Sequence, residues 1–499
     1  MRRQGSAAWE IAAAGLLFAA CATALNGLVW GVGDHDIIAA FHGERLAGDL
    51  LTNARDAHPS VLWWLVGGQG GAAWNALHVA ALVLTGALLF LLGRALISWR
   101  AGAWLVLPLL APSIELLGGA PLVDPLLLPR GMALPLELGL VLAAVHGRWR
   151  LAWLLAGAAI AVHAPSRVAV TSGLALAWWP DRRAWTDVGP AVVALPVVAA
   201  GGPAGRLAPM DPAWWSLVEL RLAHHLAPSA WSPWIWLSAG ACLLAALALR
   251  EPRTRRAGLG LAGWMLVGGA LAALRVPLAV NLEPWQGARL LAVAGALGLV
   301  AWVGGDGRRA AVPIVLAGLL WCAADRPRFL PAGPDGDLAD LARWARTETP
   351  DDALFLIPPD LVGFRALARR PVFGTVKDGG ELQFDRDLAL EWRRRMELLC
   401  DCDVLEEVPE ELEAHVVFTS GLGEEELDTL FELLGDKATL LVGDQTDFAI
   451  QGGHCNFYRN DSRVAFEINP ERAKACGLSI SSELLKLARI VPKKGEGTS

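Results

Sequence analysis

Acidic and histidine side chains gather soon after the first apolar segment, where they could support two kinds of chemistry. Residues 31–65 contain the triplet Asp34-His35-Asp36, and Asp49 follows in the same stretch. Carboxylate and imidazole groups can bind a divalent cation, which would neutralise a phosphate leaving group. A carboxylate can also act as a general base toward a hydroxyl group. We therefore take Asp34 and Asp36 as candidate catalytic residues, and His35 and Asp49 as candidate metal ligands.

A second polar stretch, at about 202–230, contains Arg221, His224 and His225. These side chains could bind a charged substrate, and we take them as candidate substrate-binding residues. The plain alternative holds for both stretches, because loops in contact with water are polar whatever their role. No spacing in the sequence forces these residues together.

The apolar sequence around these stretches indicates a membrane protein. Over 499 residues the mean hydropathy is +0.41 and only 19% of residues are charged, against about 25% in a typical soluble domain. Long apolar runs continue to about residue 321, and dense charge follows. We expect a polytopic α-helical membrane domain over 1–325 and then a water-exposed α/β part. The net charge of −7 gives no reason to expect a nucleic-acid partner.

Hydropathy predicts about eleven membrane spans, each built from an apolar run. Their approximate limits are 8–30, 73–93, 101–119, 131–146, 150–163, 167–179, 187–201, 231–249, 257–274, 288–304 and 310–325. Arginine is denser in alternate connections, starting with Arg2 and Arg3, which predicts a cytoplasmic N-terminus. An odd number of spans then places the C-terminal part in the periplasm of a bacterium, outside its inner membrane.

The layout resembles the GT-C superfamily of polytopic glycosyltransferases. The segment "DLADLARWARTETPDDALFLIPPDLVGFRALARRPVFGTVKD" (337–378) is similar to the region after the last span in uncharacterised bacterial GT-C-like proteins. The resemblance covers roughly residues 1–395, and 326–399 form a connecting segment. It implies that Asp34 or Asp36 is the catalytic acidic residue, and that a polyprenyl-phosphate sugar is the donor.

The last hundred residues predict an α/β domain. Val464, Phe466 and Ile468 alternate with Ala465 and Glu467, a pattern typical of a strand with one buried face. Asn469 then precedes a proline, as at a helix start. A second helix is expected over 481–491. The predicted element order from 415 onward is β-α-β-(α)-β-β-α-α, with the two adjacent strands forming a hairpin.

The elements "FAIQGG", "RVAFEINPERA" and "GLSISSELLKLA" resemble the C-terminal half of the YfiR-like family, over about 415–491. We assign 400–495 to this partial YfiR-like region. The resemblance implies a periplasmic, non-enzymatic domain that regulates a membrane diguanylate cyclase or another envelope protein. It also implies a Cys455–Cys476 disulfide, with free thiols as the alternative.

The N-terminal half of the YfiR-like family is missing from this chain, so the incomplete sheet needs a cover. The segment 353–376, which has the pattern strand, helix, strand, is the candidate. The alternative is a recent gene fusion with an imperfectly folded tail.

Three functions follow from these patterns. The first is a membrane glycosyltransferase acting on a lipid-linked sugar. The second is a non-enzymatic, membrane-anchored YfiR-type regulator of cyclic-di-GMP signalling. A transporter, the third, would place ionisable residues inside spans, and the sequence shows few.

Overall fold

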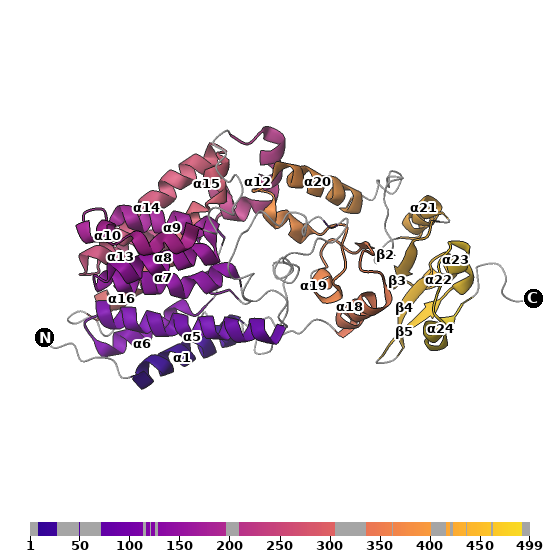
Figure 1. Ribbon diagram of the computed structural model, residues 1–499, viewed down its shortest axis with the longest axis horizontal. Helices are drawn as coiled ribbons and strands as arrows, with labels where there is room; N and C mark the ends of the chain where they lie inside the picture. Colours follow the sequence, from indigo (N-terminus) through magenta and orange to yellow (C-terminus); the bar gives the residue numbers. More distant parts are fainter. Residues whose placement is uncertain are drawn as a thin grey trace, which may run out of the picture. The chain divides into compact units, whose positions relative to one another are not determined.

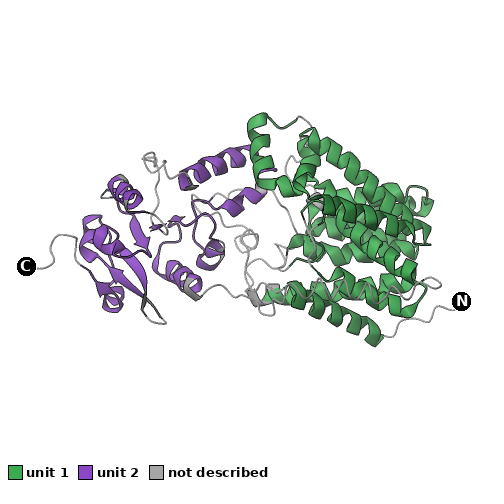
Figure 2. Ribbon diagram, turned by 180° about the vertical axis from the view of Figure 1, so that it is seen from behind, with its two compact units in different colours: residues 1–31, 55–333 green, residues 32–54, 334–499 purple. Residues whose placement is uncertain are grey.

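The computed structural model divides the chain into two compact units (Figure 2). Unit 1 is Met1–Gly31 with Arg55–Gly333, and unit 2 is Val32–Ala54 with Pro334–Ser499. The structure describes residues 8–26, 49, 71–112, 116–119, 121–124, 128–195, 209–304, 336–361, 363–400, 416–419, 423–435, 437–460 and 463–491. Unit 2 therefore unites the predicted connecting segment, the YfiR-like region and part of the connection that follows the first span.

The described part of unit 1 is helical throughout (Figure 1). Its elements are α1 (Ala8–Asn26), α5 (Gly71–Leu96), α6 (Arg100–Leu110), α7 (Pro129–Val145), α8 (Trp149–Val162), α9 (Ala164–Ala177), α10 (Arg182–Thr186), η1 (Gly189–Ala194), α12 (Pro212–Leu226), η2 (Pro228–Ala230), α13 (Pro233–Leu247), α14 (Pro252–Ala273), α15 (Pro277–Asn281), η3 (Pro284–Gly287) and α16 (Ala288–Val303).

Four stretches of helix in the described residues are long and apolar enough to cross a membrane: Ala8–Asn26, Asn75–Leu96, Pro252–Ala273 and Pro277–Val303. Four shorter apolar helices accompany them, at Arg100–Leu110, Trp149–Val162, Arg167–Ala177 and Pro233–Leu247. Large apolar side chains such as Leu244 and Leu266 are 72% and 64% exposed. Exposure on this scale is expected of helices that face lipid. The predicted span at 310–325 lies outside the described residues.

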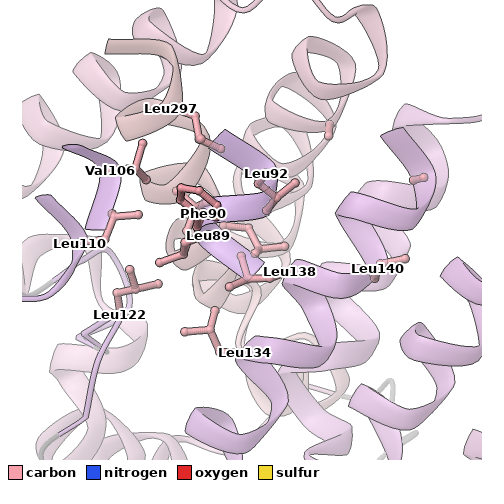
Figure 3. Close-up of a cluster of buried hydrophobic side chains, with 14 of the residues drawn as sticks. Leu89, Phe90, Leu92, Val106, Leu110, Leu122, Leu134, Leu138, Leu140 and Leu297 are labelled. Atoms are coloured by element: carbon pink, nitrogen blue, oxygen red, sulfur yellow. The ribbon is translucent and has the colours of Figure 1, made fainter. Parts of the chain in front are cut away.

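The core of unit 1 forms around α5. Figure 3 shows Leu89, Phe90 and Leu92 of this helix among Leu138 of α7 and Leu297 of α16. All five side chains are at most 2% exposed. The helices around α5 therefore pack as one bundle, with α7 and α16 on its buried side.

Unit 2 is an α/β structure. Its described elements are α18 (Gly336–Glu348), β1 (Phe355–Leu356), α19 (Phe364–Ala368), η5 (Val376–Glu381), α20 (Arg386–Cys400), β2 (Val416–Thr419), α21 (Glu424–Leu434), β3 (Leu440–Gly443), α22 (Phe448–Gln451), β4 (Cys455–Asn460), β5 (Arg463–Ile468), α23 (Pro470–Ala475), α24 (Ser482–Leu487) and β6 (Arg489–Ile490). They form one six-stranded sheet in the order β1-β2-β3-β4-β5-β6. Strands β4 and β5 pair antiparallel, as the predicted hairpin, and the other pairs are parallel.

The segment 353–376 extends the sheet of the YfiR-like region, as predicted for its cover. Phe355 of β1 pairs with Val416 of β2 on one side and forms a bridge with Val372 on the other. On one face of the sheet, Phe364 of α19 joins the cluster that contains Val416. On the opposite face, helices α21 and α22 pack over Val417. Both faces of the sheet are therefore covered at β2.

One predicted helix is shorter than expected. The helix expected over 481–491 ends at Leu487, and Arg489–Ile490 form strand β6. The Val491 amide donates to the Ile468 carbonyl at 2.9 Å. Because α24 buries no side chain, pairing with β5 outweighs the helical pattern in the last residues. The predicted N-cap is confirmed, since the Asn469 side chain accepts a hydrogen bond from the Arg472 amide at 3.0 Å.

Candidate functional site

Five charged side chains come together in unit 1. We call them the arginine cluster: Asp124, Arg130, Glu137, Arg167 and Arg289. Arg130 donates to Asp124 through Nη2 at 2.7 Å and through Nε at 3.1 Å. Arg289 Nη2 lies 3.7 Å from the other Asp124 oxygen. Three guanidinium groups thus face two carboxylates, which leaves one net positive charge.

Arg167 has donor capacity to spare. It pairs with Glu137 through Nη1, and its side chain is fully buried. Among the described residues, its Nε and Nη2 atoms have no hydrogen-bond partner, and neither does Nε of Arg289. Buried donors without a partner are rare in proteins, and each such group calls for a ligand, a water or an ion. The cluster therefore has the capacity to bind an anion.

Helix geometry adds to this positive charge. Arg130, Arg167 and Arg289 each lie in the first turn of a helix, α7, α9 and α16 respectively. The N-terminus of a helix carries a partial positive charge and free amide donors. Three of the arginines that the sequence places in the outer, arginine-poor connections therefore converge at one end of the bundle.

The predicted substrate-binding residues of α12 lie beside this cluster. His225 Nδ1 is 2.6 Å from the Gly118 carbonyl oxygen. Burial lowers the pKa of His225, while the charge of Glu283 opposes that shift and the charges of Arg130 and Arg221 reinforce it. His225 is thus within electrostatic reach of Arg130, a member of the arginine cluster, and of Arg221. His224 stacks on His225 with ring centroids 4.0 Å apart, and its side chain is exposed.

Glu283 occupies a strained backbone position. Its φ of 43° lies in the left-handed region, which side chains other than glycine seldom adopt. Strain of this kind persists only where surrounding contacts impose it, and it often marks functional sites. The contacts come from Pro284 and Trp285, which pack against Gly268 and Gly269 of α14. Glu283 is thereby held near His225.

A small, mainly apolar cavity of about 20 Å³ lies inside the bundle. Its walls come from α5, α7, α9, α14 and α16, with side chains that include Leu92, Leu138, Leu174, Leu261, Leu290 and Leu297. Leu138 directly follows Glu137 in α7, and Leu290 directly follows Arg289 in α16. The bundle thus has a charged cluster at one end and an apolar interior, and the cavity itself has room for only about one water molecule.

The structure tests the predicted catalytic residues only in part. Asp34, His35 and Asp36 lie outside the described residues. Among the residues that are described, no group of three or more His, Cys, Asp or Glu side chains could hold a metal ion. The metal site predicted at His35 and Asp49 therefore stays a prediction.

Asp49 lies in unit 2, in a buried ion cluster with Arg365 and Asp378. Its Oδ2 atom accepts hydrogen bonds from Arg365 Nε at 2.7 Å and from the Val372 amide at 2.9 Å. Arg365 donates to both oxygens of Asp378, each at 2.9 Å. All three side chains are at most 1% exposed. We call this group the Arg365 cluster, and it gives Asp49 partners that the sequence did not predict.

Cys455 and Cys476 are free thiols, so the disulfide expected between them is not formed. The Cys476 sulfur lies 3.4 Å from His454 Nε2. Because neighbouring residues of a strand point to opposite faces of a sheet, Cys455 points away from the face where His454 meets Cys476. Cys455 instead packs in the cluster around Val442, and burial raises its pKa to about 12.

Comparison with known proteins finds two separate family matches within unit 2. Residues 402–489 match the YfiR/HmsC-like family. The YfiR-like resemblance predicted for 415–491 is thus confirmed, and we call this part the YfiR/HmsC-like region. Residues 336–399 match DUF6798, a domain of unknown function, so the strand β1 that extends the sheet comes from a separate recognised family.

For the whole chain, a crystal structure of ArnT from Cupriavidus metallidurans bound to undecaprenyl phosphate aligns with a TM-score of 0.36 and 14% identity, over 96% of each chain. No curated protein matches the sequence.

Sequence reasoning did not propose Asp124, Glu283, Arg130, Arg167 or Arg289 as site residues. One signal could have linked the arginines. Each lies at the start of an apolar run, where a charged residue can stay at the membrane surface. The sequence does not show which helix N-termini lie together, because that depends on how the helices pack.

Proposed function

We propose that this protein is a polytopic membrane protein of the GT-C type that binds a lipid-linked sugar phosphate and transfers the sugar to an acceptor hydroxyl. The phosphate binds at the arginine cluster, and the lipid chain lies along the apolar helices of unit 1. The proposed localisation is a bacterial inner membrane, and the apolar helices of unit 1 support a membrane location.

The observation that carries this proposal is the set of unpaired guanidinium donors. Arg167 Nε, Arg167 Nη2 and Arg289 Nε are buried and unpartnered, and the cluster has one positive charge in excess. A phosphate oxygen accepts hydrogen bonds from guanidinium groups with high strength and defined geometry. An inorganic anion would satisfy the same donors, but the apolar helices of unit 1, with exposed side chains such as Leu244 and Leu266, favour a phosphate that carries a lipid chain.

The same charges suit the chemistry of transfer. The acceptor hydroxyl oxygen forms a bond to the anomeric carbon, and the bond from that carbon to the phosphate oxygen breaks. The leaving lipid phosphate keeps the electron pair, and the arginines stabilise its charge. The hydroxyl proton passes to a carboxylate, for which Asp34 and Asp36 are the proposed bases.

The direct test measures binding of undecaprenyl phosphate to the full chain in lipid nanodiscs. Arg167→Lys keeps a positive charge for Glu137 but removes the Nε and Nη2 donors and their planar geometry. We expect the Kd to rise at least about tenfold, since a hydrogen bond to a charged group contributes roughly 1.5–3 kcal/mol.

Arg253→Lys is the matched control. Arg253 pairs with Asp181 at 3.0 Å and donates to the carbonyls that end α7, so it lies at the end of the bundle opposite to Arg130. Its variant should bind undecaprenyl phosphate like the wild type. Equal affinities for wild type and Arg167→Lys would contradict the proposed site.

The regulatory alternative rests on the match of 402–489 to the YfiR/HmsC-like family. In this reading the region controls a membrane diguanylate cyclase, and unit 1 serves as its membrane anchor. Leu487, 77% exposed on α24, is suited to a test because its replacement disturbs no core. If Leu487→Glu changes cellular cyclic-di-GMP while undecaprenyl phosphate binding stays constant, regulation is favoured. Constant cyclic-di-GMP counts against it.

A further inference from the structure

The Arg365 cluster brings together parts of the chain that are far apart in sequence. Asp49 belongs to the connection between α1 and α5, whereas Arg365 and Asp378 belong to the DUF6798 region. All three lie within unit 2. A buried charge is costly unless it is paired, so a contact at such depth is a specific one.

Asp49 contacts the rest of unit 2 at the edge of the sheet. The Phe355 amide donates to the Pro371 carbonyl, and the Phe373 amide donates to the Phe355 carbonyl, both at 2.9 Å. Because backbone groups alternate in direction along an extended strand, the amide of Val372 points away from β1. It donates to Asp49 Oδ2 at 2.9 Å. The carboxylate thus takes the place that a further strand would occupy.

The other two members of the cluster are complete without Asp49. Asp378 accepts hydrogen bonds from both terminal nitrogens of Arg365. It also accepts hydrogen bonds from the Thr375 amide at 3.0 Å and from the Thr375 hydroxyl at 2.9 Å. The Arg365–Asp378 pair is neutral in sum. Asp49 adds a negative charge from another part of the chain, so it is the member that can leave while the pair stays intact.

We propose that the sheet edge at 371–373 is the docking site for the connection between α1 and α5, with Asp49 as the residue that holds it. The same connection contains Asp34 and Asp36, so unit 2 restrains the segment in which catalysis is predicted. Only this last consequence rests on the proposed function.

The test is limited trypsin digestion of the full chain in nanodiscs, with fragments identified by mass spectrometry. Asp49→Asn removes the charge that Arg365 binds, and Arg365→Lys removes the Nε donor. Cleavage after Arg45 and Arg55, which flank Asp49, should accelerate about tenfold or more in both variants. Arg370→Lys is the control, because Arg370 is equally buried and donates to the carbonyls of Arg346 and Thr349 instead.

Unchanged cleavage in both Asp49→Asn and Arg365→Lys would overturn the docking site. Equal acceleration in Arg370→Lys would overturn it as well, since the effect would then be a general loosening of unit 2. The digestion requires no enzymatic activity. A wild-type chain that fails to bind undecaprenyl phosphate would therefore remove the proposed function and leave the docking site standing.

Discussion

At the scale of single residues, His454 is held in its neutral form by directed hydrogen bonds. Its Nδ1 atom accepts a hydrogen bond from the Leu441 amide at 2.8 Å. The ring proton therefore lies on Nε2, which faces the Cys476 sulfur. Burial, reinforced by the charge of Arg472, lowers its pKa to about 4. Protonation would place a second hydrogen opposite the Leu441 amide and break this contact with β3.

This arrangement predicts a loss of stability in mild acid. Above pH 6.5 the ring is neutral in both the folded and the unfolded chain, and its contribution to stability is complete. As the pH falls from 6.5 toward 4, only the unfolded chain takes up the proton, which costs up to about 3 kcal/mol. Hydrogen exchange of the β3 amides in the full chain, corrected for intrinsic rates, should show protection falling between pH 7 and pH 5.

His454→Gln is the comparison for this experiment, because glutamine does not titrate. Its β3 protection should start lower and change less between the two pH values. If wild type and variant show the same pH dependence, His454 is not the titrating group.

At the scale of elements, α14 depends on glycines at its contact with η3. A Cβ added at Gly269 would lie 2.1 Å from Trp285, and one added at Gly268 would lie 2.3 Å from Pro284. Trp285 also packs edge-on against Trp231, with ring centroids 5.0 Å apart, so Trp285 has little room to move. These glycines let η3, and with it Glu283, approach the helix.

We therefore expect Gly269→Ala to destabilise unit 1 by roughly 1–3 kcal/mol, the usual cost of overpacking. Thermal unfolding in detergent, followed by tryptophan fluorescence, measures the effect. Gly263→Ala in the same helix is the control, since nothing lies within 4 Å of its added Cβ. That variant should be neutral or stabilising, because alanine favours a helix over glycine. Equal melting temperatures for the two variants would contradict the packing argument.

At the scale of the whole molecule, the sheet of unit 2 joins two recognised regions into one folding unit. Strand β1 of the DUF6798 region pairs with β2, while the other five strands follow in the YfiR/HmsC-like part. A fragment beginning after residue 400 would expose the edge of β2. The composite sheet argues against an imperfectly folded tail.

The contact between Asp49 and Arg365 also bears on membrane topology. A direct hydrogen bond requires the connection after α1 and the C-terminal part of the chain to lie on the same side of the bilayer. We therefore predict an even number of membrane crossings between them, and an odd total with α1. We predict that alkaline phosphatase fused after Val491 is active in a bacterial host, while a reporter that functions only in the cytosol stays silent. The reverse result would contradict the proposed periplasmic location.

Local signals in the sequence were enough to predict the classes of structure. Apolar runs predicted the membrane helices, and alternation in 464–468 with a cap at Asn469 predicted a strand and the helix after it, because these signals are local to the chain. It also predicted that 353–376 covers the YfiR-like sheet. It did not predict that Leu487 ends the last helix, since the pairing of β6 with β5 is a long-range contact.

Only the tertiary structure decided which charged groups meet. Arg130, Arg167 and Arg289 are far apart in the chain, and they converge because the helices that they begin pack around α5 with their N-termini at one end. Asp49 and Arg365 are 316 positions apart, yet they share a hydrogen bond. A charge pattern shows which residues need partners, but the choice of partner depends on packing between elements, which no local stretch of sequence contains.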